Sequence, residues 1–317
     1  MTERRVCRRL NLPIATTLAI IAAVGAPARS ADPPKKQIVC TFLPMYVFTL
    51  NVVGDTPGID VRLLISSDLG CPHDYAVRPA DMKLIADADL IIANGLGMEP
   101  FLVELLKPGN RATVLTVSGD CDPIRIAEKH DHAPGEKCDH DHGSVNGHVW
   151  TSPGEAIKQV NNLARQLGQA DPERASRYLA NAEAYSIRLR ALKKEFADAA
   201  AEFTRRRIVT THDAFAYMAR DLGLEVVAVL ESEPGKAPSA GRMAATVDTI
   251  RSSGAAAVFY EPSSSTRVAQ TIAREAGISA YSLNPFNSLR NRPIADSYET
   301  VMRENLTTLR KALRSDP

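Results

Sequence analysis

The segment from Pro172 to Phe203 contains no glycine and no further proline, and it constrains the fold more than any other feature of the chain. Its apolar residues recur at intervals of three and four, which places them on one stripe of a single helix. They are Tyr178, Ala182, Tyr185, Leu189, Leu192, Phe196, Ala199 and Phe203. Asp171 and Pro172 supply an N-cap and a first-turn proline. At 1.5 Å per residue this helix would span roughly 45–50 Å, more than one small lobe.

A coiled-coil dimer could show the same spacing of apolar residues. However, tyrosine and alanine along the stripe favour packing of the helix against the protein's own lobes. We therefore expect a monomer.

Short apolar runs alternate with helical patterns on both sides of this helix. The expected strands are 37–43, 60–65, 90–93, 113–117, 207–211, 225–230, 256–260 and 279–283. The expected helices between them are 47–53, 79–86, 100–106, 214–222, 240–252, 266–276 and 297–313. Such alternation predicts parallel sheets flanked by helices.

The predicted fold is therefore α/β with two lobes, each a parallel sheet flanked by helices. We assign 31–170 to an N-terminal lobe, 171–204 to the long linking helix and 205–317 to a C-terminal lobe. Ligands of such sheets bind beyond the carboxyl ends of the strands. A ligand site is therefore expected in the cleft between the lobes.

The first 30 residues have the pattern of a cleaved export signal. A basic region ends at Arg9, an apolar run extends from Leu12 to Gly25, and small residues suited to a signal peptidase follow. The run is shorter than the ~20 residues of a membrane span. Cys7 precedes the apolar run, which argues against a lipoprotein. We expect residues 1–30 to be removed and the mature protein to reside in the periplasm.

The charge of the mature chain argues against a nucleic-acid partner. Residues 1–30 contain five arginines and one glutamate, so the rest of the chain has 33 basic and 36 acidic side chains. No basic field remains that would attract nucleic acid.

Four cysteines lie beyond the leader: Cys40, Cys71, Cys121 and Cys138. The periplasm permits disulfides, but three pairings are possible and the sequence does not choose among them. A bond between Cys121 and Cys138 would close the base of a polar loop. Alternatively, Cys40 lies inside an apolar strand and would be a buried thiol.

The distribution of the seven histidines gives the strongest indication of function. His73 follows the second strand, His148 lies in Asn-Gly-His-Val-Trp, and His212 lies at the end of a second-lobe strand. Each alone could be an ordinary surface or core histidine, but three at strand ends or helix starts of both lobes can converge on one site. Neutral imidazole is a strong zinc ligand, and three imidazoles with one further donor complete a tetrahedron.

The other four histidines alternate with acidic residues in a polar loop, 128–142: His130, His132, His140 and His142. Such a segment cannot form a core. Its imidazoles and carboxylates offer weak sites for zinc, copper or nickel. We predict an auxiliary metal loop; the alternative is a solvated loop of accidental composition.

Taken together, these motifs resemble those of the zinc- and manganese-binding solute receptors of ABC importers, the ZnuA-like or TroA-like group. The resemblance extends from Gln37 to the C-terminus, and it includes the acidic histidine-rich loop and the long helix. Pro-His-Asp-Tyr-Ala-Val-Arg-Pro-Ala-Asp, Gly-His-Val-Trp-Thr-Ser-Pro and Thr-His-Asp-Ala-Phe-Ala-Tyr resemble the family's three ligand motifs. The resemblance thus implies His73, His148 and His212 as ligands. The resemblance also implies zinc, because family members that bind manganese have a glutamate where this chain has His212.

The fourth ligand departs from the family pattern. The family usually supplies an aspartate near the end of the last strand, before a proline, where this chain has Asn284. An asparagine oxygen can coordinate a metal but offsets no charge. Alternatively, Asn284 caps the turn before Pro285. Glu261, at another strand end of the second lobe, is a further candidate near the metal.

We therefore expect a periplasmic receptor, not an enzyme, that captures Zn²⁺ and delivers it to the membrane permease of an ABC importer, with Mn²⁺ less favoured. A periplasmic metallochaperone is a further candidate partner. Two alternatives stay open. A secreted zinc hydrolase could use the same histidines with Glu261 as a base, although the sequence has no His-Glu-x-x-His motif. A periplasmic zinc buffer or chaperone would need no permease.

Overall fold

The computed structural model describes residues 35–67, 72–106, 109–126, 145–230, 239–262, 266–289, 294 and 296–314. The predicted signal peptide, residues 1–30, lies outside the described residues. The same holds for the histidine-rich loop 128–142, for Cys71 and for Cys138. Among the described helices, none combines the length and the apolar character that crossing a membrane requires.

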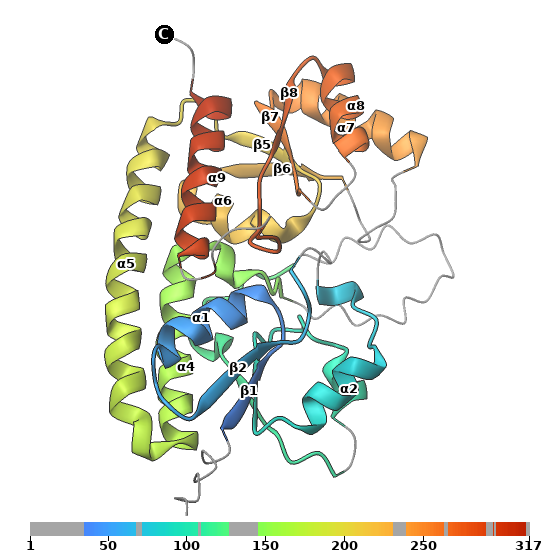
Figure 1. The fold of residues 1–317 in the computed structure, drawn as a ribbon. Helices are drawn as coiled ribbons and strands as arrows, with labels where there is room; N and C mark the ends of the chain where they lie inside the picture. Colours follow the sequence, from blue (N-terminus) through green and yellow to red (C-terminus); the bar gives the residue numbers. More distant parts are fainter. Residues whose placement is uncertain are drawn as a thin grey trace, which may run out of the picture. The chain divides into compact units, whose positions relative to one another are not determined.

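The N-terminal lobe is built on a four-stranded parallel sheet with the strand order β2-β1-β3-β4 (Figure 1). Its strands are β1 (Lys36–Cys40), β2 (Ile59–Leu63), β3 (Leu90–Ala93) and β4 (Thr113–Thr116). Its helices between strands are α1 (Leu43–Val53), α2 (Pro79–Ala86) and α3 (Leu102–Leu105). The first predicted strand, 37–43, is too long, because Pro44 stands in the first turn of α1 and starts that helix earlier.

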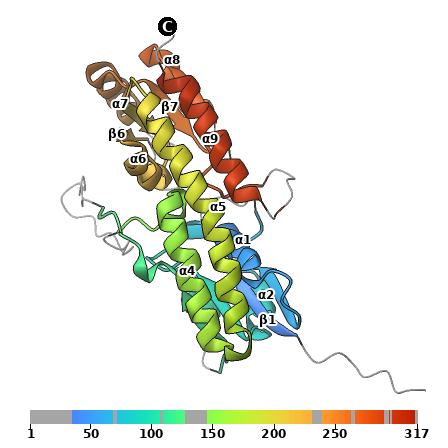
Figure 2. The same ribbon diagram turned by 90° about the vertical axis from the view of Figure 1, so that its left-hand side faces the viewer.

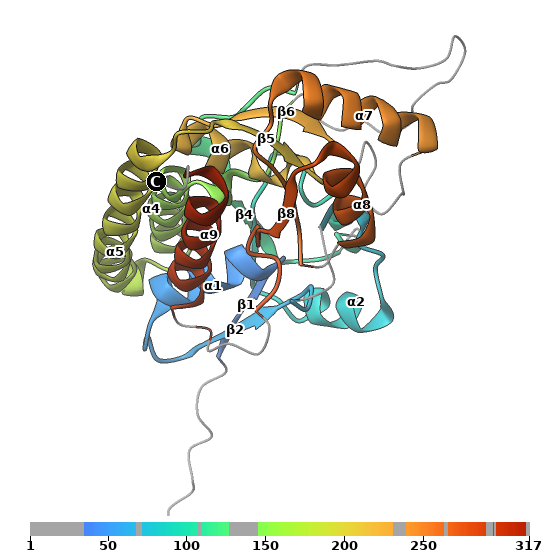
Figure 3. The same ribbon diagram turned by 90° about the horizontal axis from the view of Figure 1, so that it is seen from above.

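The C-terminal lobe repeats this topology in a second parallel sheet with the order β6-β5-β7-β8. Its strands are β5 (Arg207–Thr210), β6 (Glu225–Val229), β7 (Ala257–Tyr260) and β8 (Ser279–Ser282). Its helices are α6 (Ala216–Leu222), α7 (Ala240–Ser253), α8 (Thr266–Ala276) and α9 (Ser297–Leu313). Figure 3 shows α7 and α8 on the opposite side of this sheet from α9. The predicted fold class of two α/β lobes is confirmed.

The long helix α5 (Ala175–Glu202) connects the lobes and packs against elements of both. It contacts α1 and α4 (Pro153–Ala170) of the N-terminal lobe, and α6 and α9 of the C-terminal lobe (Figure 2). The predicted stripe from Tyr178 to Phe203 is buried. The first predicted turn is instead the short 3₁₀ helix η4 (Pro172–Arg174).

The helix α4 is absent from the sequence prediction, although its start has an ordinary signal. The Ser152 hydroxyl accepts a hydrogen bond from the Glu155 backbone N–H, and Pro153 occupies the first turn. Because only a few residues separate α4 from α5, the two helices form an antiparallel pair (Figure 2). Part of the α5 stripe therefore packs on α4.

Both described cysteines are buried free thiols. Cys40 is completely buried in β1, which agrees with the alternative of a buried thiol. Cys121 lies in the loop after β4, and its predicted partner Cys138 is outside the described residues. Burial raises the pKa of each thiol to about 12, so neither ionises near neutral pH.

Candidate metal centre

Three short 3₁₀ turns carry the three histidines that the sequence analysis assigned as ligands. His73 lies in η1 (Pro72–Asp74), which follows β2. His148 is the N-cap of η3 (Val149–Thr151), immediately before α4. His212 is the N-cap of η5 (Asp213–Phe215), directly after β5. These turns lie beyond the carboxyl ends of parallel strands or at a helix start, where α/β folds place their ligands.

The structure brings the three histidines together from both lobes. The ring centroids of His73 and His148 are 5.6 Å apart, and those of His148 and His212 are 4.9 Å apart. His148 and His212 are buried, and His73 is half-buried. His148 is therefore in ring contact with both other histidines, while the group of ligand atoms with the spacing of a metal site does not include His73.

Asn146 fixes the orientation of the His148 ring. Its Oδ1 accepts the His148 backbone N–H at 2.9 Å and lies 3.0 Å from the His148 ring Nδ1. The backbone N–H can only donate, so the Asn146 atom that faces His148 is its oxygen, and Nδ1 must carry the ring hydrogen. Nε2 of His148 therefore keeps its lone pair, which a metal ion can use.

Burial keeps the His148 ring neutral. Removal from water lowers its pKa well below the ordinary value, and the neighbouring His212 and His73 lower it further. A metal ion binds the unprotonated imidazole, so this environment prepares His148 as a ligand.

Glu261 fixes the orientation of the His212 ring, as Asn146 does for His148. Its Oε1 lies 2.7 Å from Nδ1 of His212, and its Oε2 accepts a hydrogen bond from Nδ2 of Asn287 at 2.8 Å. An ionised carboxylate only accepts, so Nδ1 of His212 carries a hydrogen, and in the neutral ring Nε2 has the lone pair. Glu261 is buried, and it lies immediately after β7, as the sequence analysis expected.

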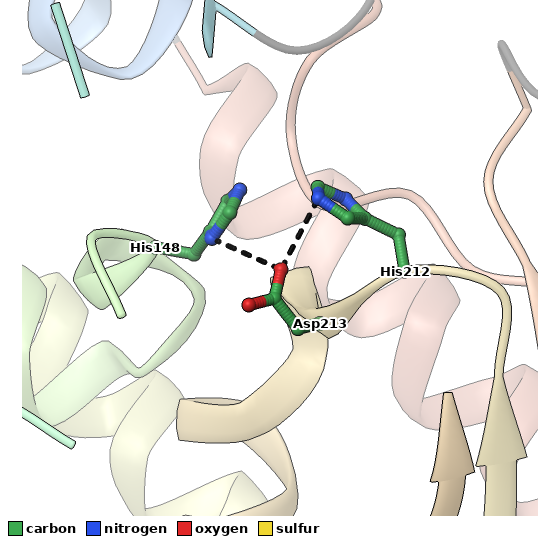
Figure 4. Close-up of side chains that lie close together, drawn as sticks. All are labelled: His148, His212 and Asp213. Atoms are coloured by element: carbon green, nitrogen blue, oxygen red, sulfur yellow. Dashed lines mark ion pairs between the residues drawn. The ribbon is translucent and has the colours of Figure 1, made fainter. Parts of the chain in front are cut away.

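Asp213 is the functional candidate that the sequence analysis missed. Among the described residues, one group of histidine, cysteine and acidic side chains has the spacing of a metal site: His148, His212 and Asp213, with ligand atoms within 4.8 Å of one another (Figure 4). Oδ1 of Asp213 lies 3.1 Å from Nε2 of His212 and 3.9 Å from Nδ1 of His148. The sequence feature that could have identified Asp213 as a site residue is its position directly after His212.

Asn284 makes the hydrogen bonds of a turn cap. Its Oδ1 accepts from the backbone N–H of Phe286 and of Asn287, at 2.9 and 3.3 Å, and its Nδ2 donates to the Ser288 carbonyl oxygen. These contacts hold a turn in which Phe286 has a positive φ of 64°. They correspond to the alternative function that the sequence allowed for Asn284, while its coordination of the metal stays a prediction.

The donor set fits a divalent transition metal. Two imidazoles and one carboxylate have ligand atoms within 4.8 Å of one another, and His73 lies beside His148. These are the nitrogen and oxygen ligand types of a four-coordinate zinc ion. The donors come from both lobes, so such an ion would connect them.

Comparison with known proteins gives relatives that are named for zinc. The chain is 32% identical over 290 residues to the zinc-binding protein AdcA of Streptococcus pyogenes, a match that covers 87% of this chain and 56% of AdcA. The chain thus spans little more than half the length of that relative. It is 31% identical over 308 residues to the high-affinity zinc uptake system protein ZnuA of Bacillus subtilis, and this match covers 95% and 96% of the two chains.

The solved structures include a close fold match. The solute-binding protein FpvC of Pseudomonas aeruginosa, solved in complex with Mn²⁺, superposes with a TM-score of 0.73 at 32% identity, covering 88% of this chain and 98% of that one. The sequence model of the ZnuA family, described as zinc-uptake complex component A, periplasmic, matches residues 38–312. This match covers nearly the whole described chain, and the protein belongs to the ZnuA family.

Proposed function

We propose that this protein is the periplasmic receptor of an ABC importer, which binds Zn²⁺ through His73, His148 and His212 and delivers it to the membrane permease. One observation carries the proposal: His148 and His212 belong to different lobes, yet their rings lie 4.9 Å apart. In each ring a hydrogen-bond partner holds Nδ1, so Nε2 is the atom that would bind the ion.

Zinc is the cargo that the donor set favours. Imidazole nitrogen suits zinc, whereas manganese prefers oxygen ligands. The names of the two sequence relatives agree with zinc. FpvC was solved with Mn²⁺, and this makes direct competition between the two ions the relevant measurement.

Capture and release of the ion need no covalent step in this proposal. The chain supplies orientation, because Asn146 and Glu261 hold two of the rings in place. It also supplies desolvation, because His148 and His212 are buried. Since both lobes contribute ligands, a permease that shifts one lobe relative to the other would break the site and release the ion.

The delivery route completes the proposal. Residues 1–30 would direct export and be cleaved, and the mature chain would work in the periplasm without a lipid anchor. The histidine-rich loop 128–142 would collect zinc weakly, and its four histidines lie outside the described residues.

The test is zinc titration of the mature protein and of a variant with His73→Ala, His148→Ala and His212→Ala. The wild type should bind one zinc ion tightly, with Mn²⁺ and Cu²⁺ competing in parallel titrations, and the triple variant should lose this site. Tight binding in the triple variant would refute the ligand assignment. Zinc-dependent uptake should also fail in cells that lack the protein, whereas hydrolysis of ester, peptide or phosphate substrates by the loaded protein would support the enzyme alternative.

A further inference from the structure

We propose that Asp213 is the fourth, anionic ligand of the metal. This inference rests on the proposed function, because it names the donor that completes the site of His73, His148 and His212. It replaces the donor that the last strand, β8, was expected to supply through Asn284.

The other candidate donors are already engaged. Both oxygens of Glu261 have partners, Nδ1 of His212 at 2.7 Å and Nδ2 of Asn287 at 2.8 Å. Oδ1 of Asn284 accepts two backbone N–H groups of its own turn. Moving either oxygen to the metal would take these partners away from their donors.

Asp213 is placed differently, because one of its oxygens points at the histidines. Its Oδ2 accepts a hydrogen bond from Nδ2 of Asn146 at 3.2 Å, and the same Nδ2 donates to the Asp213 backbone carbonyl at 2.9 Å. Oδ1 is the oxygen that faces His148 and His212 (Figure 4). Asn146 therefore positions Asp213 and His148 together.

The contact between Asp213 and His212 calls for a cation. Because Glu261 engages Nδ1 of His212, the Nε2 atom that faces Asp213 is the one with the lone pair in the neutral ring. A lone pair and a carboxylate oxygen 3.1 Å apart repel each other unless a proton or a metal ion lies between them. A metal ion bound to both atoms supplies the positive charge.

The spacing agrees with shared coordination. Two ligand atoms about 2.0–2.1 Å from a tetrahedral zinc ion lie about 3.3 Å from each other. The 3.1 Å between Oδ1 of Asp213 and Nε2 of His212 is close to this value. The charge agrees as well, since three neutral imidazoles offset none of the two positive charges of zinc and the Asp213 carboxylate offsets one.

The experiment compares zinc binding by the mature protein and by the variants Asp213→Asn, Asn284→Ala and Asp198→Asn. Asp198 is an exposed residue of α5, paired with Lys194, and its substitution makes the same change of charge away from the site. We expect Asp213→Asn to weaken zinc binding by more than about 100-fold, beyond the ~10–100-fold that groups outside the coordination shell typically contribute. Asp198→Asn should bind as the wild type does, and Asn284→Ala should lose less than Asp213→Asn.

A zinc affinity of Asp213→Asn within threefold of the wild type would overturn the inference, as would a larger loss in Asn284→Ala. If Asp213→Asn does not fold, a crystal structure of the zinc-loaded wild type decides. An Asp213 oxygen about 2.0–2.2 Å from zinc supports the assignment, and a water or another residue in that position refutes it. Failure of the proposed function is distinct from these results, because then the wild type itself would show no specific zinc site, or the triple histidine variant would keep one.

Discussion

Trp150 and Pro285 join the two lobes beside the metal centre: the indole N–H of Trp150 donates to the Pro285 carbonyl oxygen at 2.7 Å. Trp150 follows His148 by two residues, and Pro285 precedes Asn287, which holds Glu261. The Trp150 carbonyl in turn accepts from the Tyr298 hydroxyl of α9. The segment that carries His148 is therefore bonded to the loop that supports Glu261, the partner of His212.

Loss of the hydrogen bond between Trp150 and Pro285 should destabilise the folded protein. Trp150→Phe keeps an aromatic ring in a buried position but leaves the Pro285 carbonyl without its donor. We expect the free energy of unfolding to fall by about 1–3 kcal/mol. Urea denaturation followed by circular dichroism measures this change, and a loss below about 0.5 kcal/mol would mean that the contact contributes little.

Removal of the charge on Glu261 should weaken zinc binding without removing the site. In Glu261→Gln, an amide replaces the carboxylate that holds Nδ1 of His212, and its NH₂ group meets either that N–H or Nδ2 of Asn287. We expect the dissociation constant for zinc to rise about 10–100-fold. The matched control is Glu225→Gln, which replaces an exposed glutamate at the start of β6 and should leave the dissociation constant for zinc unchanged. An unchanged affinity in Glu261→Gln would show that His212 does not depend on this partner.

Glu99 should give the metal-free protein a pH-dependent stability. It is buried and accepts hydrogen bonds from Thr41, Asn94 and Gly95, but burial outweighs these bonds and raises its pKa from 4.5 to about 7. Between these two values the folded protein binds more protons at this group than the unfolded chain does. Stability should therefore fall as pH rises from about 4.5 to 7, by up to ~3 kcal/mol.

Urea unfolding of the metal-free protein at several pH values tests this expectation. Glu99→Gln should lose this part of the decline, because its side chain does not titrate, whatever constant cost the substitution has. Glu104→Gln, in an exposed glutamate of α3, should keep the wild-type profile. Identical slopes in the wild type and Glu99→Gln would contradict the assignment of the decline to Glu99.

Deletion of the histidine-rich loop 128–142 should lower the number of zinc ions bound while the tight site persists. In the loop sequence four histidines alternate with acidic residues, a composition that offers weak metal sites, whereas His73, His148 and His212 lie within the described fold. Isothermal titration of the deleted protein should retain one tight binding event. Loss of that event would mean that the loop supplies a ligand.

Local sequence patterns predicted most of the fold. The bounds of β3, α8 and α9 agree with the prediction, because each segment has a regular pattern of apolar residues that begins and ends at recognisable positions. The start of α1 was misplaced, since Phe42 and Leu43 extend the apolar run of β1 and conceal the helix start. The pairing of α4 with α5 could not be read from a stripe alone, because periodicity shows that a face is buried and does not show what covers it.

The sequence indicated the histidines of the candidate site more clearly than its acids. His73, His148 and His212 each follow a recognisable strand end or precede a helix, and the structure brings them together. The contact of Asp213 with Asn146 joins residues 67 positions apart, and no local pattern encodes it. Which oxygen is available to the metal depends on hydrogen bonds such as those of Asn284, and these appear only in three dimensions.

The position of Trp150 makes its fluorescence a measure of what happens at the candidate metal centre. It is the one tryptophan of the chain, it is buried, and its ring centroid lies 5.2 Å from that of His148. All tryptophan emission therefore originates beside His148 and at the junction of the lobes. Since an ion bound to His148 would change the charge and the mobility of the ring next to the indole, occupancy of the site can be followed by intrinsic fluorescence with no added dye.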